Sequence, residues 1–186
     1  MQNALLETPI EALDFLVFPD SCLYLDEVLK SLNQQKSVML VLPMQLGIDK
    51  MTPEYLPSLK YTFEMPSTLG FAGGQAKRSF YFTGLVNPHV WDDPYLTYLD
   101  PHFVQEAVKD PTSLTAQELE SFHCSDIRLL KMSKLSSSLL LGFYIKSLEE
   151  FKQFFEQVDQ LANMPNSILQ VFSKRPEEQV HESVKV

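Results

Sequence analysis

The spacing of three extended segments in the middle of the chain restricts the possible folds more than any other feature. Residues 68–72, 79–86 and 95–100 are apolar or β-branched and are bounded by Gly, Pro or Asn, as strands are. Only the short stretches 73–78 and 87–94 separate them, whereas a crossover between parallel strands needs a dozen or more residues. The three segments therefore predict antiparallel neighbours in one sheet.

Other apolar segments complete such a sheet. Residues 37–46 form a nearly continuous apolar run, which predicts a buried strand, and the proline inside the run argues against a buried helix. Residues 15–18 and 139–145 predict two more strands. Gly84 predicts a bulge, and Gly73-Gly74 predicts the end of the strand before it.

Three segments predict helices that would cover the sheet. Leu and Val recur at helical spacing in residues 25–35, and residues 52–63 begin with Thr-Pro-Glu, which favours a helix start. In residues 147–163, Ser147 and Glu150 predict a capping box. The apolar face of this last helix consists of Leu148, Phe151, Phe154, Phe155, Val158 and Leu161.

The more polar segments complete the predicted organisation. Residues 102–108 predict a short helical piece, and residues 110–120 predict a polar surface loop or an acidic helix. Pro, Ser, Lys and Glu dominate residues 165–186, which predicts a flexible tail after one domain at residues 1–164. The whole order predicts an α+β fold, in which a mostly antiparallel sheet is flanked by helices.

The charge balance limits the class of partner. The chain has 15 Lys and Arg against 24 Asp and Glu, a formal net charge of −9. Nucleic acid and anionic membrane are therefore not expected as partners, because both are bound through clustered basic residues. No apolar run approaches the ~20 residues that span a bilayer, so no transmembrane segment is expected.

Cysteine usage points to a reducing compartment. Cys22 and Cys124 lie far apart, without the spacing of a structural zinc site or a redox pair, and a secreted disulfide scaffold would carry more cysteines. The first ten residues lack the basic and apolar regions of a signal peptide. We therefore expect a cytoplasmic location.

The segment that ends at His102 contains the strongest candidate for chemistry. Asp100 and His102 are two residues apart at the end of a predicted strand, so their side chains project to the same side, and Pro101 stiffens the link. A carboxylate beside an imidazole fixes the tautomer of the ring and stabilises the imidazolium, as a catalytic base requires. The alternative is a strand-end turn with a solvated histidine.

Six short stretches around this segment occur in a fixed order. They are Leu46-Gly47-Ile48-Asp49-Lys50-Met51-Thr52-Pro53-Glu54-Tyr55, Gly70-Phe71-Ala72-Gly73-Gly74, Tyr81-Phe82-Thr83-Gly84, Tyr98-Leu99-Asp100-Pro101-His102, Ser121-Phe122-His123-Cys124 and Leu141-Gly142-Phe143-Tyr144. The ordered set resembles the carboxy-terminal half of the autophagins, papain-like cysteine proteases that process the ubiquitin-like autophagy modifier. The resemblance covers most of the chain.

The resemblance implies roles for particular residues. Asp100 and His102 match the acid and base of a Cys-His-Asp triad. The loop after Gly-Gly matches a gate over the active site, which corresponds to Gln75, Ala76, Lys77, Arg78 and Ser79. Ala76 stands where family members often carry a proline, and Gln45 stands where they often carry an arginine. No cofactor and no metal is implied.

The nucleophile of the family is missing from the sequence. The autophagins carry it in their amino-terminal half, in a Gly-Trp-Gly-Cys segment, and the single tryptophan here is Trp91 in Val-Trp-Asp-Asp. We therefore expect the chain to correspond to the sheet half of the fold, as a second half, a short isoform or a gene fragment. Cys22 and Cys124 are expected to be inert packing residues.

Other candidate residues have simpler interpretations. A metal site from His89, Asp92, Asp93 and His102 is conceivable, but a solvated turn is the preferred interpretation. We expect His123 to be a buried core residue. Residues 169–172 occupy a region where the family contacts its modifier. Residues 155–158 fit a modifier-binding pattern, but we expect their aromatic side chain to be buried.

Three functional hypotheses follow. The first is a thiol protease, or a fragment of one, that cleaves the modifier after its carboxy-terminal Gly and removes its lipid, and that is inactive without the missing cysteine. The second is a non-catalytic module that binds the modifier. The third is a truncated product that does not fold alone. The expected partners are the modifier, free or lipid-conjugated, and the missing amino-terminal half of the same fold.

Overall fold

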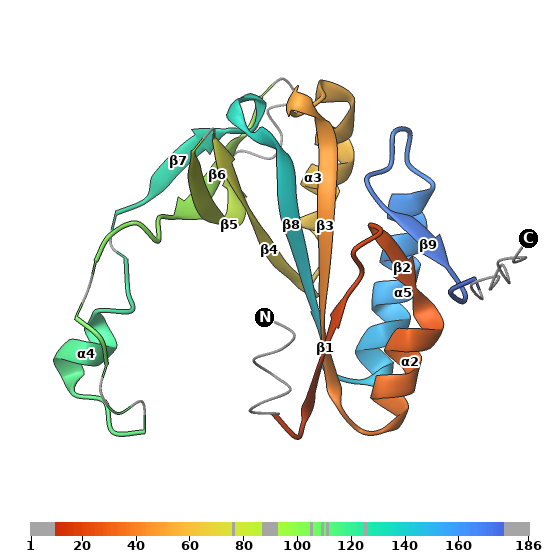
Figure 1. Cartoon of the computed structure of the whole chain (residues 1–186), viewed down its shortest axis with the longest axis horizontal. Coiled ribbons are helices and arrows are strands. Elements are labelled where there is room, and N and C mark those ends of the chain that lie inside the picture. The colour runs from red at the N-terminus through yellow and green to blue at the C-terminus, as the bar shows by residue number, and fades with distance from the viewer. Residues whose placement is uncertain are drawn as a thin grey trace, which may run out of the picture.

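A seven-stranded sheet, strongly curved into an arch, forms the frame of the molecule (Figure 1). The computed structural model describes residues 10–75, 77–86, 93–104, 106–108, 110, 112–124 and 126–176. The sheet consists, in spatial order, of β1 (Leu13–Val17), β3 (Ser37–Lys50), β8 (Ser136–Ile145), β4 (Thr68–Gln75), β5 (Arg78–Val86), β6 (Tyr95–Leu99) and β7 (Arg128–Lys131). The β1–β3 pair is parallel and the other five pairs are antiparallel.

The helices stand mainly against one side of this sheet. They are α2 (Leu25–Asn33), α3 (Leu56–Thr62), α4 (Ala116–Glu120) and α5 (Leu148–Ala162), with short 3-10 turns at Pro53–Tyr55 and Met132–Lys134. A second sheet pairs β2 (Cys22–Tyr24) with β9 (Gln170–Phe172) in parallel beside α2 and α5. The α+β fold with a mostly antiparallel sheet flanked by helices is therefore confirmed.

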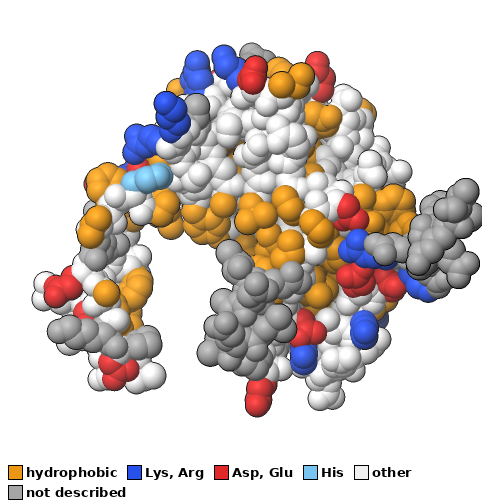
Figure 2. Space-filling view, viewed as in Figure 1, with side chains coloured by type: hydrophobic (Ala, Val, Ile, Leu, Met, Phe, Trp, Pro, Cys, Tyr) orange, Lys and Arg blue, Asp and Glu red, His pale blue; other side chains and the backbone are white. Residues whose placement is uncertain are grey.

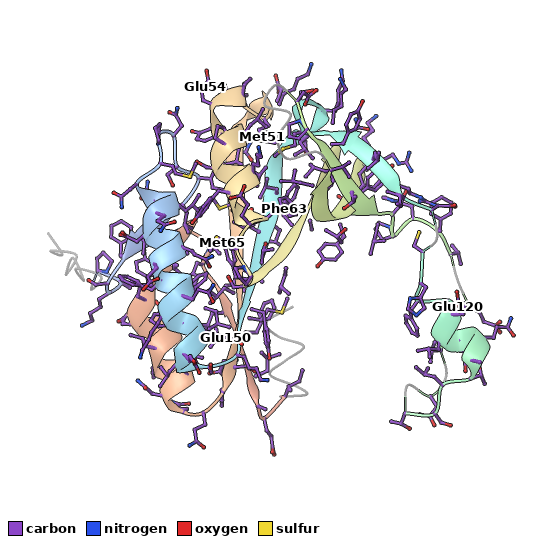
Figure 3. The ribbon with its side chains drawn as sticks, turned by 180° about the vertical axis from the view of Figure 1, so that it is seen from behind. Met51, Glu54, Phe63, Met65, Glu120 and Glu150 are labelled. Carbon is purple, nitrogen blue, oxygen red and sulfur yellow. The ribbon has the colours of Figure 1, made fainter. Side chains whose placement is uncertain are left out.

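The core lies between the sheet and α2, α3 and α5. Alternate residues of β3 and β8 are buried there because successive strand side chains point to opposite faces. Phe143 of β8 packs edge-on against Phe154 of α5, with ring centroids 5.4 Å apart. Phe63 and Met65 follow α3 and point toward the sheet (Figure 3), and Phe63 lies 5.6 Å from the ring of Phe71.

The opposite face of the sheet is apolar but only partly covered. Figure 2 shows hydrophobic side chains along the inside of the arch. A groove of about 340 Å³ crosses β3, β8, β4 and β5 on this face, and its walls include Met39, Val41, Leu69, Tyr81 and Leu140.

Most expected strands are present, but several boundaries and one helix differ from the prediction. β4 continues through Gly73 and Gly74 to Gln75, because these glycines pair with Phe80 and Ser79 of β5. None of the described residues between 102 and 108 is helical. The predicted bulge at Gly84 is confirmed by the shift in the β5–β6 register between Phe82 and Gly84.

Helix α5 differs from the prediction in its cap and in the width of its apolar stripe. Ser147 caps α5 by accepting the Glu150 N–H, but Glu150 accepts from the Lys146 N–H instead of completing the capping box. The buried apolar face of α5 is narrower than expected. Phe151 and Phe154 are buried, whereas Phe155 and Leu148 are each 42% exposed. Phe155 lies 100° further round the helix axis than Phe154, and here that rotation places it outside the buried stripe.

The segment after α5 was expected to be a flexible tail, yet its first part packs on the domain. Ile168 and Leu169 are buried, and β9 pairs residue by residue with β2. Arg175 forms ion pairs with Glu27 and Asp20 at 2.8 and 3.1 Å. Residues 177–186 of the expected tail lie outside the described residues.

Among the helices that are described, none is both long and apolar enough to cross a bilayer.

Candidate active site

Asp100 and His102 meet at the end of β6. His102 Nδ1 lies 2.6 Å from Asp100 Oδ1, and the His102 backbone N–H donates to the same oxygen at 3.0 Å. Pro101 lies between them and fixes the turn that brings the ring back onto the carboxylate. The Asp100 side chain is 3% exposed and that of His102 is 46% exposed. The ring is thus held on its Nδ1 side and accessible from solvent.

Two arginines approach the other oxygen of Asp100. Arg78 Nη2 is 3.0 Å and Arg128 Nη1 is 3.6 Å from Oδ2. Burial alone would raise the pKa of the Asp100 carboxyl, but the His102 hydrogen bonds and the charge of Arg78 hold it below its usual value. Asp100 is therefore ionised at neutral pH and serves as an acceptor for the His102 ring.

Aromatic side chains form the floor beneath the pair. Phe80 is buried, lies edge-on to the His102 ring at 6.1 Å and packs on Tyr98 at 4.5 Å. Arg128 lies over the ring of Phe103, 4.3 Å from its centroid. The His102 ring is therefore supported from below by β5 and β6, the two strands that end at this corner of the sheet.

The expected gating loop is shorter than its sequence span. Gln75 ends β4 and pairs with Arg78 of β5, and Ser79 pairs with Gly74, so three of the five residues belong to strands. Lys77 has φ 69° in the turn. Ala76 lies outside the described residues. Because Arg78 contacts Asp100, this turn lies beside the candidate dyad.

Gly74 makes this hairpin possible. A Cβ at Gly74 would lie 2.0 Å from the Arg78 carbonyl oxygen, a distance that no side chain tolerates. The close approach of the two backbones therefore requires a glycine directly before the turn.

Neither cysteine lies at this corner. Cys22 belongs to β2, where its thiol donates to the Asp20 carbonyl at 3.4 Å. Cys124 follows α4 on the arm that stands away from the sheet (Figures 1 and 3), and its thiol donates to the Asp126 carbonyl at 3.3 Å. Cys124 is exposed, which corrects the expectation of a packing residue, and both cysteines are free.

The other sequence candidates that the structure describes are not gathered into a second centre. Asp93 binds the backbone N–H and hydroxyl of Ser133 at 2.9 and 2.8 Å. Within the described part of the chain, no three His, Cys, Asp or Glu side chains are grouped to hold a metal ion. His123 is exposed, so its expected place in the core is wrong. His89, Asp92 and Trp91 lie outside the described residues.

Sequence reasoning missed the two arginines as members of the site. Arg78 was part of the expected gate without an ionic role, and Arg128 was in no expected element. The strand register places both arginines near Asp100, because Tyr81 pairs with Leu99 and Tyr98 pairs with Arg128. Burial alternates along β7, but its sequence, Arg-Leu-Leu-Lys, does not alternate, so it offered no periodic signal for a strand.

Comparison with known proteins assigns the sequence to a family. Residues 1–157 match the Peptidase C54 catalytic domain. Cysteine protease ATG4A of Oryza sativa subsp. indica is 38% identical over 129 residues, which are 69% of this chain and 26% of the rice protein. Cysteine protease atg4 of Dictyostelium discoideum is 34% identical over 145 residues, 78% of this chain and 18% of that protein.

A vertebrate relative gives the same result. Cysteine protease ATG4D of Xenopus laevis is 35% identical over 132 residues, 71% of this chain and 26% of the frog protein. The matched part of the chain thus spans about a quarter or less of the length of these curated relatives. The match over residues 1–157 and these relatives show that the chain belongs to the peptidase C54 family, the ATG4 cysteine proteases or autophagins.

Proposed function

We propose that this chain supplies the acid–base half of a thiol protease that cleaves the ubiquitin-like autophagy modifier after its carboxy-terminal Gly and later removes the lipid from it. The observation that carries the proposal is the 2.6 Å contact between His102 Nδ1 and Asp100 Oδ1 on an otherwise accessible ring. The family membership supports a cysteine protease, and the modifier as substrate is the part that we propose.

Each member of the pair has a role in the proposed reaction. When Nδ1–H donates to Asp100, the His102 Nε2 atom is left to accept the proton of a thiol. The thiolate attacks the carbonyl carbon of the terminal Gly, and His102 then gives the proton to the leaving amine. Water attacks the resulting thioester with His102 as base, which releases the modifier and regenerates the thiol. Asp100 stabilises the imidazolium in both steps.

The nucleophile in this scheme comes from outside residues 1–186. The thiols of Cys22 and Cys124 bond to carbonyl groups of their own neighbourhoods, away from the corner that holds His102. We propose that an amino-terminal half of the same fold supplies the cysteine and covers the apolar groove of β3, β8, β4 and β5. By itself the chain is then inactive as a protease.

A second candidate function is favoured by the position of both thiols away from the dyad. The chain would then bind the modifier without cleaving it, and the gate, Gln75–Ser79, would contact the modifier's tail.

Two free thiols in the chain fit a reducing compartment, and we propose that the protein is located in the cytoplasm.

A reconstitution assay tests the proposal. The purified chain is mixed with the amino-terminal half of the rice relative, and cleavage of a modifier precursor is followed by gel electrophoresis. We expect cleavage only in the mixture, and its loss with His102→Ala in this chain. Binding of the modifier without cleavage in the mixture would favour the non-catalytic module. Cleavage by the chain alone, blocked by iodoacetamide, would contradict the proposal.

A further inference from the structure

The Asp100 carboxylate is nearly sealed from solvent although its neighbours are exposed. Its side chain is 3% exposed, whereas His102 is 46% and Arg78 is 58% exposed. A buried carboxylate is stable as an anion only if both oxygens have partners. Oδ1 accepts from the ring and the backbone N–H of His102. The stability of the anion therefore also depends on the partners of the second oxygen, Oδ2.

The two arginines near Oδ2 differ in distance and in anchoring. Arg78 Nη2 donates to Oδ2 at 3.0 Å, which is a normal hydrogen bond. Arg128 Nη1 lies at 3.6 Å, beyond hydrogen-bond length, and its guanidinium stacks on Phe103. Among the described residues, Arg78 is thus the one that satisfies Oδ2, while Arg128 contributes charge.

Arg78 is itself fixed in this place. It begins β5 opposite Gln75, so its backbone is held by the hairpin. Its guanidinium carbon lies 5.3 Å from the centre of the Phe80 ring, and the same ring faces His102 edge-on. Phe80 therefore supports both groups that contact Asp100, one on each carboxylate oxygen.

We infer that Arg78 is a positioning residue of the site, which fixes the plane of the Asp100 carboxylate so that Oδ1 faces His102 Nδ1. Without a donor on Oδ2, the carboxylate plane can turn about the Cβ–Cγ bond of Asp100, and the hydrogen bond to His102 Nδ1 weakens. The inference deepens the proposed function and rests on it for the role of His102 as base. Arg78 also follows the turn at Lys77, so the same side chain links the gate to the dyad.

The tautomer of the His102 ring tests this role without any turnover. Long-range nitrogen–proton NMR on the labelled chain, mixed with the unlabelled amino-terminal half of a relative that covers the groove, reports the ratio of Nδ1–H to Nε2–H forms at about pH 8, where an unperturbed histidine is neutral. We expect Nδ1–H to dominate in the wild type. Arg78→Met should lower the ratio by at least about threefold, because one hydrogen bond that orders the acceptor is lost. Arg78→Lys, which retains a donor, should restore most of it.

Matched controls separate orientation from charge. Lys77→Met removes the same charge from the adjacent position and should leave the ratio unchanged, while Asp100→Ala sets the limit without an acceptor. An unchanged ratio in Arg78→Met, or an equal fall in Lys77→Met, would overturn the inference. Circular dichroism checks the fold of each variant.

A second measurement needs no variant. In the wild type, a guanidinium bonded to Oδ2 should give resolved, slowly rotating Nη–H signals for Arg78, and a freely rotating group would overturn the inference. Neither readout depends on cleavage, so they distinguish a failure of this inference from a failure of the proposed protease function.

Discussion

At the scale of single residues, the site combines a buried anion with an exposed base. Asp100 is held on both oxygens, whereas the His102 ring is held on one nitrogen and open on the other side. That asymmetry suits a base that must exchange a proton with a substrate while its partner stays ionised. The substitutions with the largest effect on catalysis should therefore be at these two positions.

Removal of either member of the pair should nearly abolish turnover in the reconstituted protease. His102→Ala and Asp100→Ala should each lower kcat by about a thousandfold or more, because base and orienting acid act as one unit. Modifier binding, measured by calorimetry, should change little. His123→Ala and Asp159→Ala, both exposed and on other elements, are the matched controls. Near-normal turnover in Asp100→Ala would remove Asp100 from the mechanism.

The acidic side of the stability profile should reflect the paired carboxylates. Burial would raise the pKa of Asp14, but its hydrogen bond with Lys36 at 2.7 Å lowers it below 3.8, and Asp100 is also lowered. Such groups bind fewer protons in the folded state, so their stabilisation is complete above the unfolded pKa and is lost below about pH 4. Urea unfolding between about pH 7 and about pH 3 should show this fall, and Asp14→Asn should reduce it. A flat profile would contradict the assignment.

At the scale of elements, the regular apolar patterns were sufficient to predict β3, β5, β8 and α5. Their buried residues follow the period of a strand or a helix, so local sequence and tertiary burial agree. β9 was missed because its three residues gain their partner from β2, a long way back in the chain. The dyad was predictable from two residues two apart, but the arginines required the register of β5, β6 and β7.

The segment around β9 should contribute strongly to stability. Ile168 is 6% exposed and Leu169 is 2% exposed, so truncation of either to Ala should cost about 2–4 kcal/mol by loss of burial and creation of a cavity. Ile127 and Leu119, which are 78% and 53% exposed, provide controls of the same chemistry, and their substitution by Ala should cost less than about 0.5 kcal/mol. Urea unfolding measures the difference. Equal effects at buried and exposed sites would mean that β9 does not pack as described.

At the scale of the whole molecule, the sheet is covered by α2, α3 and α5 on one face and presents the apolar groove on the other. Burial of apolar area is worth about 25 cal/mol per Å², so a domain-sized contact of several hundred Å² contributes many kcal/mol. Loss of such a contact is large beside a total stability of about 5–15 kcal/mol. This energy supports our proposal that the amino-terminal half of the protease binds in the groove.

The isolated chain should therefore bind an apolar dye and self-associate through this face. Light scattering should give a mass above that of one chain, and thermal unfolding by near-ultraviolet dichroism should be broad. Addition of the amino-terminal half of a relative should suppress dye binding. Met39→Glu, placed in the groove, should reduce self-association, whereas Lys152→Glu on exposed α5 should not. A monodisperse monomer with a sharp transition and no dye binding would make the chain a self-sufficient module.

We propose that the base lies in this chain and the nucleophile in the amino-terminal half, and a covalent trap tests both placements. A modifier that carries an electrophile in place of its terminal Gly carboxylate traps the attacking thiol as a stable adduct, and mass spectrometry identifies the chain that carries it. In the mixture of both halves, we predict an adduct on the cysteine of the amino-terminal half, formed more slowly with His102→Ala. An adduct on Cys22 or Cys124 of this chain, lost when that cysteine is changed to Ala, would contradict the account.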